Sequence, residues 1–262
     1  MATTYDTYRR EPRGASANMV RRQIRRFLCP AALVVLVPAV IGFLGSDALA
    51  LRQVRVSSTD AALEKEVCEY LSVPERANTL FFPTRSLAEQ ALKCPRVKSA
   101  RVDRELPHAM VVHVKPRIPA FALTSGPNYV MVDEEGVLLF QTHAPGRQYP
   151  RVDDRSSAPR MLGGKLNEQC LATVLACIVG ARQAKMQPGF ILDLGTAYDY
   201  RMLTQGRTPV LLGGPDNMVR KVIIAGSTEQ HLRKRGARAE YIDVTVVTNP
   251  RYKLRRGDRR AP

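Results

Sequence analysis

The sequence predicts an α+β protein that is held in a membrane by a single N-terminal helix. The first observation is an uncharged apolar run, Phe27–Gly45, whose 19 residues would span about 29 Å as a helix, close to the hydrocarbon thickness of a bilayer. The second is that helix-period and strand-period patterns alternate through the rest of the chain. The third is the composition, 45% hydrophobic and 24% charged, which supplies enough apolar material for two modest packed domains.

The charges on either side of the apolar run predict its orientation. Residues 1–26 hold seven arginines against two acidic residues, and the run is followed at once by Asp47. Because positive flanks stay on the cytoplasmic side, we predict a basic cytoplasmic tail at 1–26, a transmembrane helix at 27–50 and an exported remainder. A cleaved signal peptide is the alternative, because Ala48-Leu49-Ala50 is similar to a cleavage site, but the run is longer than the apolar region of most signal peptides.

The first exported segment has the pattern of a small two-layer domain. A half-buried strand at Gln53–Ser57 precedes two helices, one that begins after Asp60 and ends before Pro74 and one that runs from Thr84 to Pro95. Two extended segments rich in β-branched residues follow. The predicted order is β-α-α-β-β within residues 51–118, a sheet with two helices on one face.

Residues 119–250 predict a second, mixed α/β domain with an antiparallel sheet. Gly136 can adopt the positive φ of a tight hairpin turn after Asp133-Glu134-Glu135, and these acids are typical of a solvated turn. The segment 145–165 is predicted to be a long connection. Helices are predicted at 171–184 and 218–235, and strands at 129–132, 137–140, 190–192, 200–203, 209–212 and 239–247. The basic segment 251–262 is predicted to be a disordered tail.

Motifs for catalysis, cofactors and metals are missing from the sequence. There is no P-loop, no H-E-x-x-H, no G-x-S-x-G and no S-x-x-K with K-T-G, so we predict no enzyme, no catalytic, cofactor-binding or metal-binding residue and no small-molecule substrate. Zinc-finger spacing and tryptophan are also absent, which argues against nucleic-acid binding despite the net charge of +16. Cys68 and Cys94 could pair in an oxidising compartment, and the sequence leaves that disulfide open.

The order of these parts resembles the FtsQ/DivIB family of bacterial cell-division proteins. Each motif alone is weak, but their order and spacing after one membrane span is specific. Two positions depart from the family pattern: Leu106 stands where a tryptophan is frequent, and Thr245 stands where an arginine is frequent. The motifs that carry the resemblance are Val54-Arg55-Val56, Asn78-Thr79-Leu80-Phe81, Cys94-Pro95-Arg96-Val97 through Val102, Leu106-Pro107, Val111 to Ala120, Val132-Asp133-Glu134-Glu135-Gly136-Val137 and Tyr241-Ile242-Asp243-Val244.

The resemblance implies a POTRA domain at 51–118, an FtsQ-type β domain at 119–250 and a non-enzymatic division scaffold. Such a scaffold would lie in the inner membrane at the midcell septum and bind the FtsB/DivIC and FtsL type of membrane protein. The last strand would bind a partner by strand addition if it is a sheet edge, whereas an interior strand would already be satisfied. Its candidate residues are Tyr241, Ile242, Asp243, Val244, Thr245, Val246 and Val247. Two other functions stay open, a POTRA-containing export or outer-membrane assembly component and an exported cell-wall enzyme.

Overall fold

The computed structural model describes residues 34–43, 47–75, 77–154, 161–195 and 199–255. The predicted cytoplasmic tail and part of the predicted span, 27–33 and 44–46, lie outside these residues. Residues 34–43 are helical. Within the described ranges, no helix is both long enough and apolar enough to cross a membrane.

The folded part of the chain begins earlier than the sequence predicted. Asp47–Leu49 form a short 3-10 helix, η1, and Ala50 forms an antiparallel bridge with Asn78. Leu49 is 7% exposed, and its carbonyl oxygen accepts a hydrogen bond from the Thr79 N–H at 2.8 Å. The prediction of one continuous helix to residue 50 is therefore wrong at its C-terminal end, because Asp47–Leu49 form a separate 3-10 helix and Leu49 and Ala50 pair with Thr79 and Asn78.

The chain divides into two compact units. The smaller contains residues 1–55, 73–83 and 103–111, and the larger contains 56–72, 84–102 and 112–262.

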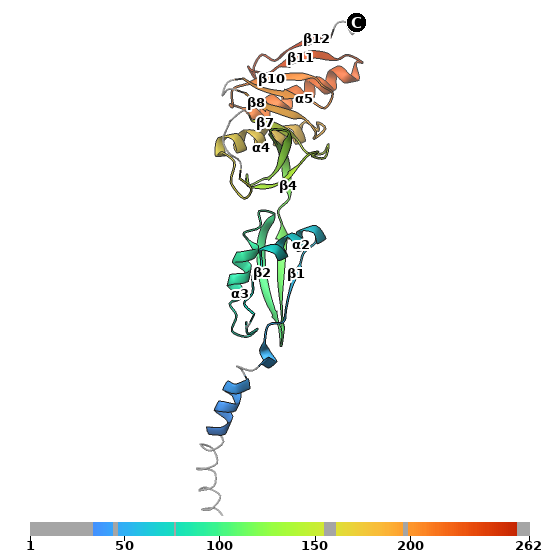
Figure 1. The fold of residues 1–262 in the computed structure, drawn as a ribbon. Coiled ribbons are helices and arrows are strands. Elements are labelled where there is room, and N and C mark those ends of the chain that lie inside the picture. The colour runs from blue at the N-terminus through green and yellow to red at the C-terminus, as the bar shows by residue number, and fades with distance from the viewer. Residues whose placement is uncertain (1–33, 44–46, 76, 155–160, 196–198, 256–262) are drawn as a thin grey trace, which may run out of the picture. The chain divides into compact units, whose positions relative to one another are not determined.

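The predicted β-α-α-β-β order is confirmed. Three strands form a sheet in the order β1-β3-β2 (Figure 1). Asp60 caps the first helix by accepting a hydrogen bond from the Ala62 N–H at 2.9 Å, as its position before an apolar-periodic run predicts. Leu63, Val67 and Leu87 are fully buried, so the helices cover the sheet with apolar stripes. The elements are β1 (Gln53–Ser57), α2 (Ala61–Tyr70), α3 (Thr84–Ala91), β2 (Val97–Glu105) and β3 (Ala109–Pro116).

The rest of the larger unit is built on a nine-stranded sheet in the order β12-β11-β10-β9-β8-β7-β4-β5-β6. The sheet is mixed rather than antiparallel, because β7 pairs in parallel with β4 and β8, and β10 pairs in parallel with β11. The sequence missed β7, which lies inside the predicted connection 145–165. The strands are β4 (Pro119–Ser125), β5 (Asn128–Asp133), β6 (Leu138–Thr142), β7 (Arg151–Asp154), β8 (Ile191–Leu194), β9 (Tyr200–Leu203), β10 (Pro209–Gly213), β11 (Ala239–Asp243) and β12 (Arg251–Leu254).

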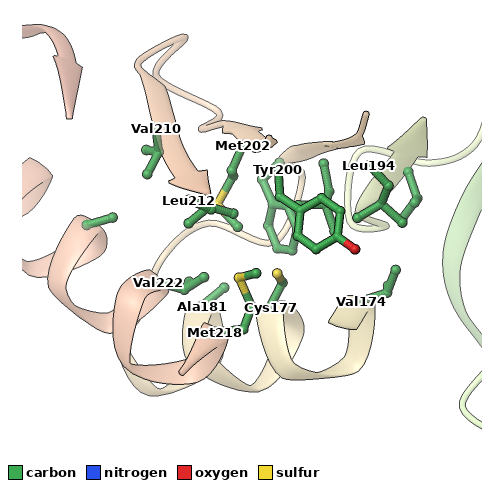
Figure 2. Packing of buried hydrophobic residues seen from close by; sticks show 14 of the residues in the cluster. Val174, Cys177, Ala181, Leu194, Tyr200, Met202, Val210, Leu212, Met218 and Val222 are labelled. Atoms are coloured by element: carbon green, nitrogen blue, oxygen red, sulfur yellow. The ribbon is translucent and has the colours of Figure 1, made fainter. Parts of the chain in front are cut away.

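Two long helices, α4 (Glu168–Gln183) and α5 (Met218–Lys234), provide the second layer of this unit. Figure 2 shows Cys177 and Ala181 of α4 and Val222 of α5 pointing toward Met202 and Leu212 of the sheet. All of these side chains are buried. The helices themselves approach closely at Gly180, where an added Cβ would lie 2.8 Å from the Val219 carbonyl oxygen.

The hairpin turn between β5 and β6 has the predicted glycine geometry. Gly136 has a φ of +80°, and the side chain of Asp133 accepts hydrogen bonds from the N–H groups of Glu135 and Val137. The carboxylates of this turn form ion pairs: Arg117 contacts Asp133 and Glu135 at 2.7 Å each, and Lys98 contacts Glu135 at 2.8 Å.

Cys68 and Cys94, whose pairing the sequence left open, are both free thiols in the structure. Cys68 is exposed and Cys94 is buried. The Cys94 thiol donates to Glu66 Oε1 at 3.6 Å, and burial raises its pKa.

Candidate functional site: the β12 edge of the larger sheet

The nine-stranded sheet has two outer strands, β6 and β12, and their main chains are the places where another strand could pair. In an outer strand, one row of N–H and C=O groups faces away from the sheet. The partner-binding prediction can therefore be examined by asking which of these rows the chain itself covers.

Strand β12 was not predicted, because residues 251–262 were expected to be a disordered tail. That expectation is wrong for Arg251–Leu254, which pairs antiparallel with β11: Asp243 faces Arg251, and Ile242 faces Tyr252. The pairing continues past the strand, since the Arg255 N–H donates to the Arg238 carbonyl oxygen at 3.0 Å. This segment forms a strand because of tertiary structure: one side of β11 has unpaired main-chain groups, and a short segment of alternating residues can pair with them.

The candidate residues Tyr241–Val247 are divided between a strand and a loop. Tyr241, Ile242 and Asp243 belong to β11, which lies between β10 and β12, so of the two alternatives that the sequence left open these three residues follow the interior strand rather than the sheet edge. The strand ends because the Asp243 side chain accepts hydrogen bonds from both the N–H and the hydroxyl of Thr245. Local Asp chemistry thus overrides the β propensity of the residues that follow.

The loop that follows contributes both buried and exposed positions. Val244 is buried, and its N–H donates to the Leu211 carbonyl oxygen at 3.0 Å. Val246 is exposed and lies in a turn closed by a hydrogen bond from the Asn249 N–H. Among the predicted residues, Tyr241 and Val246 are the exposed apolar side chains. Tyr241 lies in β11 opposite Lys253 of β12, and Val246 lies in the connection between the two strands.

The main-chain groups of β12 alternate between its partner strand and the outside. Because the Arg255 N–H points toward β11, the period of two places the N–H groups of Tyr252 and Leu254 on the outward side. In the described residues, β11 is the only strand that pairs with β12. The outward row is available to another chain.

The side chains of β12 combine charge and aromatic surface. Arg251 and Lys253 are exposed, and Lys253 Nζ lies 3.1 Å from a carboxylate oxygen of Glu240. Tyr252 faces the same side of the sheet as its buried neighbour Ile242, yet it is 51% exposed. The apolar face of the sheet therefore continues to the edge, where an added strand would extend it.

At the opposite edge, a loop of the chain covers the start of β6. The Leu138 N–H donates to the Gly164 carbonyl oxygen, and the Leu138 carbonyl oxygen accepts from the Gly163 N–H. Val137 also forms an antiparallel bridge with Lys165. Leu138 and Leu139 are buried, so the start of β6 is occupied.

Two other features of the described part of the chain were candidates for a site. No group of three or more His, Cys, Asp or Glu side chains there could hold a metal ion. A hollow between the ends of α4 and α5 contains Thr204 and Glu229, but the Thr204 hydroxyl donates to Glu229 Oε1 at 2.7 Å, and the Thr208 N–H donates to Thr204 Oγ1. These polar groups satisfy one another.

The β-α-α-β-β module defines the class of protein. The sequence model described as "POTRA domain, FtsQ-type" matches residues 49–117, the β-α-α-β-β module together with η1. This identifies a POTRA-bearing protein and agrees with the structural finding that the module begins before residue 51.

Curated relatives point to a particular family. The chain is 26% identical to the cell division protein FtsQ of Streptomyces coelicolor over 87% of this chain and 90% of the relative. It is 30% identical to FtsQ of Mycobacteroides abscessus over 67% of this chain and 58% of that protein, and 20% identical to the cell division protein DivIB of Clostridium acetobutylicum over 78% and 82%. The FtsQ-type POTRA match and these relatives together support the FtsQ/DivIB family of cell-division proteins as the family that this chain resembles.

Tyr252 and Lys253 are the site residues that sequence reasoning missed. A signal was present, because Arg-Tyr-Lys-Leu at 251–254 alternates polar and apolar residues with the period of a strand. The high basic charge of the segment instead led to the prediction of a disordered tail.

Proposed function

We propose that this protein is a single-pass scaffold of the cell-division machinery that lies in the inner membrane and acts by binding other division proteins. The β12 edge is the single observation that carries the proposal: its outward N–H groups are unpaired within the described residues, and it carries an exposed aromatic side chain between two basic ones. An edge of this kind suits recognition and offers no group for bond chemistry.

The membrane anchor is supported by the sequence and by the start of the folded domain. The apolar run at 27–45 follows a strongly basic tail, and residues 34–43 within it are helical. Cleavage after Ala50 would remove Leu49, a buried residue whose carbonyl oxygen is bonded to Thr79. The packing of Leu49 therefore favours a retained anchor over a cleaved signal peptide.

Strand addition at β12 is the proposed mode of partner binding. A partner segment would pair with the outward groups of Tyr252 and Leu254, and its side chains would meet Tyr252 on one face and Lys253 on the other. Tyr241 and Val246 of the predicted set Tyr241–Val247 are exposed nearby and could contact the same segment. The partners that fit the family are membrane proteins of the FtsB/DivIC and FtsL type, whose own single spans would place them beside this anchor.

Localisation of the full chain tests the proposal. A fluorescent fusion is expressed while the native protein is depleted. A band at midcell, with division restored, is the expected result. Uniform signal around the envelope together with normal division after depletion would contradict the division role. The mass of the mature protein tests the anchor separately, since an intact chain retains residues 1–50 and a cleaved one lacks them.

A further inference from the structure

One end of the smaller unit is formed by three segments that hydrogen bonds join together. The Leu51 N–H donates to the Ala77 carbonyl oxygen at 2.8 Å, which ties the chain entering β1 to the loop between α2 and α3. The Arg52 N–H donates to the His108 carbonyl oxygen at 2.9 Å, which ties the same segment to the turn between β2 and β3. We call residues 47–52, 77–82 and 104–108 the tip of this unit.

Arg104 fixes the loop of the tip. Its guanidinium donates to the carbonyl oxygens of Thr79 at 3.1 Å and Phe82 at 3.0 Å. These two bonds hold the main chain on both sides of Leu80 and Phe81. The side chains at these positions are therefore presented by a fixed loop.

The tip exposes apolar side chains that contribute little to the core. Phe81 is 65% exposed, Leu106 is 60% exposed and Leu80 is 37% exposed. A cluster of large apolar side chains on one end of a soluble unit usually marks a surface that meets a membrane or another protein.

The position of the tip in the chain favours a membrane over another protein as what this apolar surface contacts. Only three residues lie between Gly45, the end of the apolar run, and Leu49, so the four steps of chain that join them span at most about 14 Å. Leu49 in turn is bonded to Thr79, the residue before Leu80. The headgroup region on each side of a bilayer is about 5–8 Å thick, so the tip is within reach of it.

The charge of the tip indicates how such a contact would be made. The segments of the smaller unit around it, 47–55, 73–83 and 103–111, hold four arginines and four acidic residues, a formal charge of zero. Attraction to anionic lipid would therefore contribute little, and burial of apolar surface would be the main source of affinity.

We propose that the tip rests in the headgroup region of the bilayer that anchors the chain, with Leu80, Phe81 and Leu106 inserted beside the lipid. This inference rests on the proposed membrane anchor. It adds a second point of contact, so that the exported part leaves the membrane from a fixed base rather than from a free tether.

The sequence provides a direct test because it contains no tryptophan. The full chain is placed in lipid nanodiscs as single-tryptophan variants. Phe81→Trp and Leu106→Trp lie at the tip. Arg55→Trp is the control, because it lies on the exposed face of β1 about 10 Å along the chain from Arg52, the last residue of the first tip segment. Brominated phosphatidylcholine then quenches tryptophan that lies close to lipid. We expect at least twofold stronger quenching at both tip positions than at position 55, unchanged in 0.5 M salt.

The outcomes separate this inference from the proposed anchor. A fourth variant, Leu36→Trp, reports the predicted span. Strong quenching there with tip variants quenched no more than Arg55→Trp overturns the tip inference alone. No quenching at Leu36→Trp overturns the anchor and the tip inference together. A tip variant that is shielded from iodide but not quenched by brominated lipid would show a protein neighbour, which also overturns the lipid contact.

Discussion

The two edges of the nine-stranded sheet are finished in opposite ways. At β6, Leu138 exchanges hydrogen bonds with Gly163 and Gly164, and the residues at the start of the strand are buried. At β12, Arg251, Tyr252 and Lys253 are exposed, and within the described ranges only β11 pairs with the strand. Among the described residues, a loop occupies the start of the β6 edge, whereas no strand pairs with the outer side of β12.

This difference teaches how a protein can keep an open edge without aggregating. An exposed edge strand invites pairing with any chain, and short length and lysine are two common protections. β12 has four residues, and Lys253 lies among them. The same features leave main-chain groups free for a matching partner, so protection and selective binding are compatible at this edge.

The largest expected effect contrasts the interior neighbour with the edge strand itself. Ile242 of β11 is fully buried, so Ile242→Ala should lower the free energy of unfolding by about 2–5 kcal/mol through lost burial and a residual cavity. Tyr252→Ala, on the facing residue of β12, should change it by less than about 1 kcal/mol. Urea unfolding of the two variants checks the contrast. Equal losses would mean that β12 belongs to the core.

The next effect concerns the covered edge. Gly136→Ala should destabilise the protein by about 1–3 kcal/mol, because φ is +80° and a Cβ would lie 2.8 Å from Leu171 Cδ2 in α4. Gly126→Ala is the matched control, with φ at +59° but no atom within 4 Å, and should lose only the strain of the backbone. Thermal unfolding distinguishes them. A control that loses as much as Gly136→Ala would show that contact with α4 is unimportant.

The third prediction concerns a substitution that removes a hydrogen-bond donor from the β12 edge. Tyr252→Pro removes an outward N–H while leaving the bonds to β11 in place, so partner capture should fall by at least about tenfold, equivalent to about 1.4 kcal/mol. Co-purification from cells measures capture, and the unfolding temperature confirms that the fold survives. Tyr252→Ala keeps the N–H and should lose less. Val246→Pro should leave capture unchanged, because Val246 lies outside both strands. Full capture by Tyr252→Pro would exclude strand addition at β12.

The smallest effect is a pH dependence at the turn beside the covered edge. Hydrogen bonds and charge from Lys98 and Arg117 lower the pKa of Glu135 to about 2 from its ordinary 4.5. A depressed carboxyl pKa stabilises the folded state above about pH 4.5, and this contribution is lost as the pH falls toward 2. Glu135→Gln should therefore lose less stability than the wild type between pH 5 and pH 2 in urea unfolding. Glu134→Gln is the control and should follow the wild type. Parallel curves for all three proteins would contradict the role of the ion pairs.

The sequence alone determined the β-α-α-β-β order of the first module and the positions of the two long helices, because local chemistry specified these elements. The Asp60 cap, the prolines that follow α2 and α3, Gly136 in its turn and the periodic faces of α4 and α5 all act within a few residues of chain. The family resemblance followed from the same order of motifs, and the relatives confirm it.

Only the tertiary structure decided where the sheet ends. Strands β7 and β12 are four residues long and lie in polar segments, so their own propensity does not identify them. Each becomes a strand because a neighbour presents an unpaired row of hydrogen-bonding groups, and that row is created by distant parts of the chain. The edge of the sheet is therefore Arg251–Leu254, which pairs with the last open side of the assembled sheet, and not Tyr241–Val247, where β propensity is highest.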